Sequence, residues 1–282
     1  MTSVIISGSD GFIAKHLIKK ISKKKIKVIK MGKIFGDVSK KNTWDKLPSA
    51  DVVIHLAGKT FVPDSWKNPK IFFNSNVTGT KMALDYCKKN DAKLIFLSSY
   101  MYGNTKKLPT NERAKINANN PLAVTKKKAE DLCRVYSKKY NLKTIILRPS
   151  NVYGPNQKSF WLIPEMINKF KKKNITINNL LIKRDMIFVF DLVDAIIKSI
   201  YLKNKFEIIN IGSGKSYSIG KIIKLMQKKF NKKILIKNNN TIRKNEIIET
   251  QLDITKAKKI LKWKPFWNLE NGLNHTIKLN KK

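Results

Sequence analysis

The sequence has two cysteines, few acidic residues and no long apolar run. Cys87 and Cys133 lie far apart on segments whose apolar spacing predicts amphipathic helices, which excludes a disulfide framework and a Cys-x-x-Cys metal site. The first residues carry no basic segment, and no apolar run approaches the roughly 18 residues that a membrane-spanning helix requires. We therefore expect a cytoplasmic protein with two packed thiols, no bound metal and no membrane partner.

Acidic side chains number only 19 against 59 lysines and arginines, which gives a formal net charge of +40 over 282 residues. Such a charge is typical of nucleic-acid-binding proteins, because basic side chains release counterions from phosphate backbones. Only five of the basic residues are arginines, however, and the guanidinium fork is the group that grips phosphates and guanine edges in pairs. The lysines are spread along the chain, so we expect a solvated basic surface that attracts small anions and no nucleic-acid partner.

Short apolar runs alternate with helical patterns over the first half of the chain. With 42% hydrophobic residues, a sizeable core can form. Apolar runs predict strands at 4–6, 26–29, 51–56, 94–97 and 144–147, and apolar residues at helical spacing predict helices at 12–21, 77–87 and 121–140. This alternation predicts an α/β fold with a doubly wound parallel sheet and helices on both of its faces.

The pattern becomes irregular beyond Pro155. Asn-rich and Lys-rich stretches are followed there by two further predicted helices, at 191–202 and 219–230. We expect a first domain over 1–155 and a small C-terminal cap over 156–282, with the segment 184–211 returning to the first domain.

A glycine turn separates the first predicted strand from the first predicted helix, in the sequence SGSDGFIA at 7–14. At the first turn of a doubly wound sheet, glycines allow a pyrophosphate to approach the backbone and the start of the helix, which favours nucleotide binding. In NAD-binding proteins a carboxylate at the end of the second strand meets the ribose. Here that region carries Lys30 and Lys33, with no carboxylate until Asp37, which favours NADP over NAD.

Further short motifs follow in a recognisable order. They are DVVIHLAG at 51–58, NVTGT at 76–80, SSYMYG at 98–103, LRPSNVYGP at 147–155, RDMIFVFD at 184–191, NIGSG at 210–214, and DITKA at 253–257 with WKP at 263–265. With the glycine turn, these motifs resemble the extended short-chain dehydrogenase/reductase family, in particular the NAD-dependent epimerase/dehydratase group that acts on nucleotide sugars. The resemblance runs nearly from end to end, and it implies a Rossmann fold with a substrate-binding cap.

The resemblance also implies NAD or NADP as cofactor, a nucleotide sugar as substrate, a role in polysaccharide synthesis and, by analogy with similar enzymes, a homodimer formed by the helices at 77–87 and 121–140. The implied cofactor contacts are Gly8, Gly11, Phe12 and Ile13 at the pyrophosphate, Asp37 at the adenine, Leu56, Ala57 and Gly58 beneath the dinucleotide, Lys126 at the ribose, and Pro149 and Val152 beside the nicotinamide. On the substrate side the implied residues are Asn151 and Arg243. His55 reads as a packed residue at a strand end.

Similar enzymes move a proton with a Tyr-x-x-x-Lys pair on one helix face, because residues i and i+4 point the same way. In this chain Lys126 is present, but the tyrosine position holds Leu122. Loss of a general base typically lowers the rate by about 10²–10⁴. We expect a serine of the 98–103 motif to bind the substrate oxygen. Matching the family's motif backward from Tyr102 favours Ser98, whereas matching it forward along the strand favours Ser99, which is our first choice.

Three explanations of how the proton is transferred remain open. Tyr100 or Tyr102 carries it, or Lys126 or a bound water does, or the protein binds its ligands without turnover. Tyr153 is assigned no proton role. The sequence thus predicts an NAD(P)-dependent nucleotide-sugar epimerase, dehydratase or reductase, which would make it an isomerase or an oxidoreductase. The alternative is a catalytically silent member of the family that binds cofactor and sugar nucleotide without turnover.

Overall fold

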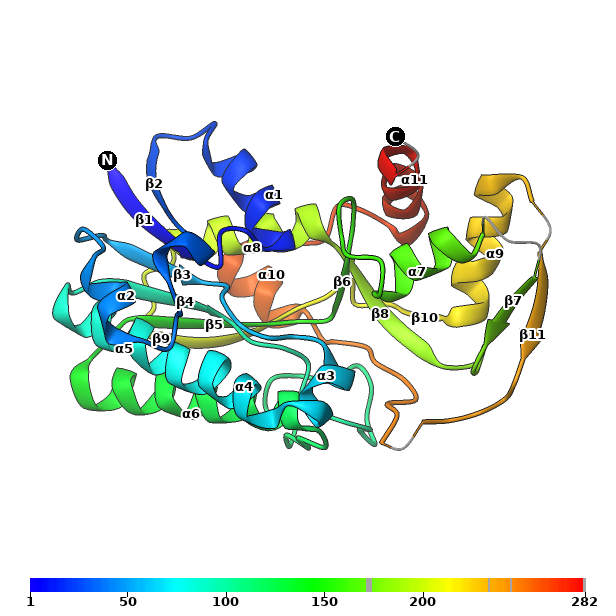
Figure 1. Cartoon of the computed structure of the whole chain (residues 1–282), viewed down its shortest axis with the longest axis horizontal. Helices are drawn as coiled ribbons and strands as arrows, with labels where there is room; N and C mark the ends of the chain where they lie inside the picture. Colours follow the sequence, from blue (N-terminus) through cyan, green and yellow to red (C-terminus); the bar gives the residue numbers. More distant parts are fainter. Residues whose placement is uncertain (171–173, 233, 244, 281–282) are drawn as a thin grey trace.

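The computed structural model describes residues 1–170, 174–232, 234–243 and 245–280. Six parallel strands form the central sheet of a first lobe, on the left of Figure 1. In spatial order they are β2 (Ile26–Met31), β1 (Thr2–Ser7), β3 (Val52–His55), β4 (Lys93–Leu97), β5 (Thr144–Pro149) and β9 (Phe206–Ile211). The inner strands are almost continuously apolar because helices bury both of their faces.

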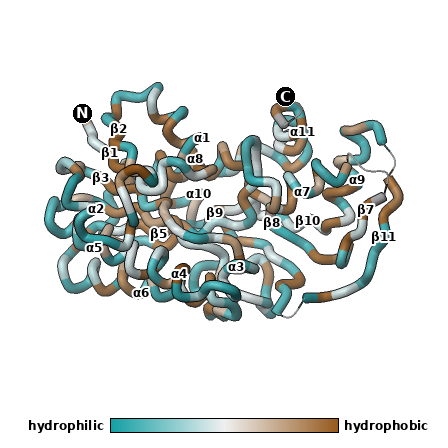
Figure 2. The backbone as a smooth tube through the Cα atoms, viewed as in Figure 1, coloured by the Kyte–Doolittle hydropathy of each residue, from teal (hydrophilic) through white to brown (hydrophobic). Residues whose placement is uncertain are grey.

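Two helical layers cover the sheet. One face packs on α1 (Phe12–Ile21), α8 (Val189–Ile200) and α10 (Thr255–Leu261), and the other on α2 (Lys41–Asp45), α5 (Gly79–Lys89) and α6 (Pro121–Tyr140). Figure 2 shows hydrophobic residues along the central strands. This arrangement confirms the predicted doubly wound α/β fold.

A second lobe has its own apolar core. Its strands are β6 (Asn151–Tyr153), β8 (Lys183–Phe188) and β10 (Ser216–Ser218) in one sheet, and β7 (Asn174–Ile177) and β11 (Leu235–Asn238) in a parallel pair. Its helices are α7 (Leu162–Lys169), α9 (Ile219–Phe230) and α11 (Leu269–Asn280). Between β8 and β10 the chain passes back through α8 and β9 in the first lobe, so the two lobes exchange segments.

Local signals explain where the helices begin and end. Asn120 accepts a hydrogen bond from the Ala123 amide at the start of α6, and Asn141 ends that helix in a left-handed conformation. The predicted helix at 77–87 differs, because a π-helical turn, η2 (Asn74–Thr78), precedes α5. Short helices α3 (Val62–Lys67) and α4 (Pro69–Phe73) and a 3-10 turn, η1 (Lys33–Phe35), complete the described elements.

Both cysteines are buried and unpaired, as the sequence predicts. Within the described ranges, no helix is long and apolar enough to cross a bilayer, and no cluster of three or more His, Cys, Asp or Glu side chains could hold a metal ion.

Candidate active site

A cavity of about 410 Å³ lies between the lobes, at the carboxyl ends of β1, β3, β4 and β5. Ligands of open α/β sheets bind at this edge. Its lining includes most of the predicted residues: Gly8, Gly11, Phe12, Ile13, Leu56, Gly58, Ser98, Ser99, Lys126, Pro149, Asn151 and Val152. The charged residues among the described lining residues are Lys126 and Arg184, both cationic.

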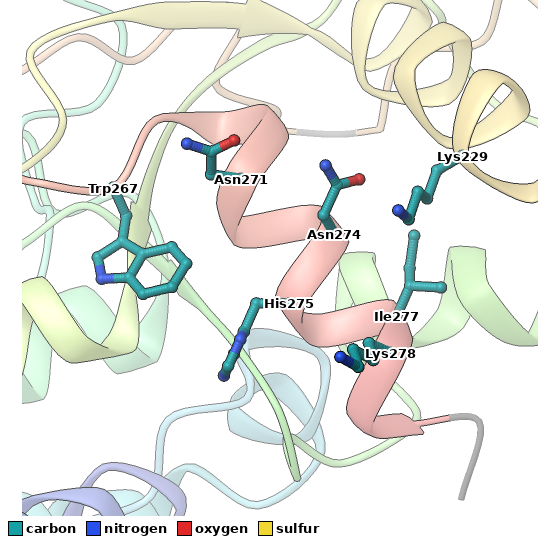
Figure 3. A pocket seen from close by; sticks show the side chains of 7 residues that line it. All are labelled: Lys229, Trp267, Asn271, Asn274, His275, Ile277 and Lys278. Carbon is teal, nitrogen blue, oxygen red and sulfur yellow. The ribbon is translucent and has the colours of Figure 1, made fainter.

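A second cavity, of about 440 Å³, lies against α11 in the second lobe (Figure 3). It is lined by Lys229, Trp267, Asn271, Asn274, His275, Ile277 and Lys278. None of the predicted site residues is among them, so the candidate active site is the cavity between the lobes.

The glycine turn packs tightly against the end of β3. Gly8 has a φ of +71°, and a Cβ at this position would lie 2.8 Å from the Ala57 backbone. A Cβ on Gly11 would approach the Gly8 carbonyl to 3.0 Å. Only glycine therefore fits at Gly8, and the turn exposes main chain to the cavity.

The start of α1 is equipped for an anion. Gly11 is its N-cap and offers no side-chain hydrogen bond, and no acidic residue lies in the first turn. The first amides of a helix lack acceptors within the helix and lie at the positive end of its dipole. The Gly11 amide donates to the Gly8 carbonyl at 2.9 Å, whereas Phe12 and Ile13 line the cavity, so an anionic group bound there can accept from their amides.

Hydrogen bonds around His55 hold the ends of β1 and β3 together. Ser7 Oγ lies 2.7 Å from His55 Nδ1 and accepts a hydrogen bond from the Ala57 amide at 3.3 Å. His55 is fully buried and stacks on Phe96, and burial lowers its pKa to about 3. His55 is thus a neutral, packed residue, as the sequence predicts.

Asn76 fixes the loop that follows β3. Its Oδ1 accepts from the Lys59 amide at 2.9 Å, and its Nδ2 donates to the Lys59 carbonyl and to Thr125 Oγ1 at 3.1 and 3.0 Å. This amide therefore links the loop next to Gly58 with the helix that carries Lys126.

Lys126 and Leu122 occupy one face of α6 and both line the cavity. The Lys126 ammonium donates to the Leu97 carbonyl at 2.8 Å. Burial lowers the pKa of Lys126 to about 8, against the opposing effect of the Glu130 carboxylate. One turn earlier, Leu122 presents an apolar side chain where similar enzymes place a phenol.

The two serines after β4 differ in their partners. Ser98 is buried, and its hydroxyl has no hydrogen-bond partner among the described residues. The Ser99 hydroxyl donates to the Tyr100 carbonyl at 3.1 Å. Both serines line the cavity, and of the two only Ser98 has a hydroxyl without a hydrogen-bond partner among the described residues.

The nearby tyrosines have hydrogen bonds of their own. Tyr100 lines the cavity, but its hydroxyl donates to the Gly103 carbonyl at 2.8 Å and burial raises its pKa. The Tyr102 hydroxyl donates to Asn210 Oδ1 at 2.7 Å, and burial raises its pKa to about 12. Tyr153 is buried and donates to the Leu269 carbonyl. Each of these three phenols thus already donates to an acceptor within the protein.

The wall of the cavity in the second lobe contains a cation that sequence reasoning did not single out. Arg184, at the start of β8, lines the cavity beside Asn151 and Thr250. It pairs with Glu246, and burial lowers the pKa of its guanidinium. The sequence feature that could have identified Arg184 is its place as the first residue of the RDMIFVFD motif at 184–191.

Three predicted residues lie outside the cavity lining. Asp37 is exposed, and its carboxylate accepts from the Ser39 amide and hydroxyl at 2.8 and 2.9 Å. The Ala57 backbone lies directly behind Gly8. Arg243 is exposed, though its charge is near enough to oppose that of Arg184.

Comparison with known proteins identifies the family of this chain. Residues 4–212 match the model of the NAD dependent epimerase/dehydratase family. The chain belongs to this family. UDP-glucuronate 4-epimerase from Thermodesulfobacterium geofontis is 34% identical, covering 83% of this chain and 73% of its own. dTDP-4-dehydro-6-deoxyglucose reductase from Escherichia coli is 30% identical, covering 98% and 96%.

Solved structures of this fold include an epimerase with its ligand. The UDP-glucose 4-epimerase of Thermotoga maritima, determined with UDP-glucose, has a TM-score of 0.92 and 25% identity, with 99% of both chains covered. Other structures of the fold are complexes with NAD or NADPH. The family assignment and the predicted fold are thus confirmed. The relatives of this chain include epimerases and a reductase.

Proposed function

We propose that this chain binds a nicotinamide dinucleotide and a nucleotide-activated sugar in the cavity between the lobes, and acts as a nucleotide-sugar epimerase, dehydratase or reductase. One observation carries the proposal. The glycine turn, Lys126 and Ser98, whose buried hydroxyl has no described hydrogen-bond partner, all line one cavity whose described charged residues are cations.

The cavity fits the dinucleotide. Gly8 and Gly11 let the turn pack tightly on itself and on the Ala57 backbone, and the first amides of α1 can donate hydrogen bonds to a diphosphate. The Lys126 ammonium has one described acceptor, the Leu97 carbonyl, so its other N–H groups can hold ribose hydroxyls. Pro149 and Val152 supply an apolar wall for the nicotinamide. When bound, a nicotinamide supplies a hydride acceptor or donor.

The sugar nucleotide would occupy the rest of the cavity. Ser98 Oγ can donate a hydrogen bond to a sugar oxygen, because no described residue already accepts one from it. Arg184 provides a cation for the diphosphate, and Asn151 and Thr250 provide polar groups beside it. These contacts support a negatively charged, polar substrate.

The site lacks the proton acceptor that similar enzymes have. Leu122 cannot accept one, and the neighbouring phenols of Tyr100 and Tyr102 donate to other groups. Lys126 is the remaining titratable group in the cavity lining that the structure describes with a pKa near neutrality, about 8. We infer that Lys126, or a water held by it, moves the proton.

A catalytically silent binder is the second candidate. The engaged phenols favour it, since binding needs no general base. Incubation with NAD+ or NADPH and UDP-, dTDP- or GDP-sugars, followed by mass spectrometry, separates the two. An epimerised, dehydrated or reduced product supports the enzyme, whereas saturable binding without any product supports the binder.

Leu122→Tyr tests the missing phenol directly. If the base limits turnover, this substitution raises the rate by about 10²-fold or more. Val124→Tyr, on the same helix but 38% exposed and outside the cavity lining, is the matched control and should leave the rate unchanged. An unchanged or lower rate in Leu122→Tyr would show that a proton carrier is already built in.

A further inference from the structure

One segment of the second lobe returns along the cavity to the first lobe. After β11 the chain runs back toward the six-stranded sheet (Figure 1), and we call its residues 245–250 the strap. Ile247 and Thr250 of the strap line the cavity. The strap has no regular secondary structure beyond an isolated bridge between Lys183 and Glu249, where two backbone hydrogen bonds join it to Lys183, so side chains supply the rest of its support.

From the first lobe, two asparagines hold the strap. Asn104 Nδ2 donates to the Glu246 carbonyl at 2.9 Å, and Asn104 Oδ1 accepts from the Ile248 amide at 2.8 Å. Asn119 Nδ2 donates to the Asn245 carbonyl at 3.1 Å, and the Asn245 side chain donates back to the Asn119 carbonyl at 3.3 Å. An amide side chain is suited to this role because it both donates and accepts.

From the second lobe, the strap meets the cation of the cavity. The Arg184 guanidinium donates to the Ile247 carbonyl at 2.6 Å and pairs with Glu246. The Lys183 amide donates to the Ile248 carbonyl at 2.8 Å. The side chain of Arg184 therefore takes its position from Glu246 and Ile247, which lie between the strap residues that the two asparagines hold, Asn245 and Ile248.

We propose that Asn104 and Asn119 are positioning residues that clamp the strap, and thereby set the affinity of the cavity for the diphosphate of a nucleotide sugar through Arg184. The inference rests on the proposed function for the ligand. The glycine turn, Leu56 and Lys126 are held by β1, β3 and α6, and Asn104 has no described hydrogen bond to them. Asn119 Oδ1 accepts from Asn120 Nδ2 at 3.1 Å, but the bond that caps α6, from the Ala123 amide to Asn120 Oδ1, does not involve Asn119. A freed strap must be ordered again when substrate binds, which weakens substrate binding alone.

The test compares Asn104→Ala, Asn119→Ala and the double variant with Asn204→Ala. Asn204 is an exposed asparagine that donates to Glu207 at the opposite end of the sheet and serves as the control. Calorimetry measures the dissociation constants of NAD+ and, with NAD+ saturating, of UDP-, dTDP- and GDP-glucose. Amide hydrogen exchange at Ile248 reports the clamp without any ligand.

The double variant should weaken nucleotide-sugar binding on the order of tenfold, since several hydrogen bonds of modest net strength are lost, and leave NAD+ binding within about twofold. Exchange at Ile248 should accelerate in Asn104→Ala and stay slow in Asn104→Asp, which keeps the accepting oxygen. Equal losses for both ligands, or no loss, would overturn the clamp. If the native chain binds NAD+ but none of the three sugar nucleotides, the proposed function is wrong, and so is the substrate role of the clamp. Slow exchange at Ile248 would then still show that the strap is ordered.

Discussion

The contact between Gly8 and the end of β3 allows a quantitative test of the dinucleotide site. In Gly8→Ala, the new Cβ would lie 2.8 Å from Ala57 N and Cα and 3.1 Å from the Leu56 carbonyl carbon. These are backbone atoms of a buried strand end, so no flexible side chain can move aside. The residue would also keep a φ of +71°, which an alanine adopts only at a cost.

The two effects add. The left-handed conformation costs about 1–2 kcal/mol for a residue with a Cβ, and relief of the contact requires β1 and β3 to separate. We expect a loss of about 2–3 kcal/mol in the free energy of unfolding, or roughly 3–5 °C in melting temperature for a chain of this length. Because the turn then moves, two charge-assisted hydrogen bonds to the diphosphate are lost at about 1.5–3 kcal/mol each, which weakens dinucleotide binding more than about 100-fold.

Calorimetry with NAD+ and NADP+, together with thermal melting, measures both effects. Gly220→Ala is the matched control, because its Cβ would meet its nearest neighbour, the Leu180 carbonyl oxygen, at 3.5 Å, within helix α9. This control should bind the dinucleotide normally and melt no lower than the native chain. A Gly8→Ala protein that binds the dinucleotide within threefold of the native affinity would refute the assignment of the glycine turn.

Three further predictions concern cofactor choice, pH and assembly. The Asp10 carboxylate accepts from the Lys33 amide at 2.7 Å, just after β2; in contrast to the preference for NADP that Lys30 and Lys33 indicate in the sequence, we therefore expect NAD+ to bind more tightly than NADP+, and Asp10→Asn to reduce the ratio of the two dissociation constants in calorimetry. Burial lowers the pKa of Lys126 to about 8 in the folded chain, so between pH 8 and 9 the folded chain loses this proton while the unfolded chain keeps it. The free energy of unfolding should therefore rise over this pH range, by about 1 kcal/mol more in the native chain than in Lys126→Met, and chemical denaturation measures it. Val135 is 53% exposed on α6, and light scattering should find a dimer that Val135→Glu converts to a monomer; a native monomer would contradict the expectation.

The sequence predicted the elements well where local signals define them. Asn120 and Pro121 mark the start of α6 and Asn141 its end, so its predicted bounds agree with the structure. The π-helical turn before α5 was missed. Asn76 within that turn bonds to Lys59 and Thr125, which lie 17 and 49 positions away, and such partners cannot be read from a local pattern.

Cofactor and substrate positions were predictable to different degrees. The glycine turn and Lys126 belong to local motifs and line the cavity together. Asp10 was overlooked as the carboxylate at the end of β2, because it reaches that position from the glycine turn, 23 residues before Lys33. Arg184 and the strap escaped assignment because their contacts join segments about 60 residues apart.

Lys126 explains why the missing phenol need not affect binding. Burying an ammonium is unfavourable unless acceptors surround it. Here the Leu97 carbonyl is its one hydrogen-bond acceptor in the part of the chain that the structure describes, and the Glu130 carboxylate is already bonded twice to Arg148. Ribose hydroxyls would supply the acceptors that Lys126 lacks, whereas Leu122 leaves only the proton step without its usual group. Restoring the phenol should therefore change the turnover number and leave the dissociation constant of NAD+ unchanged.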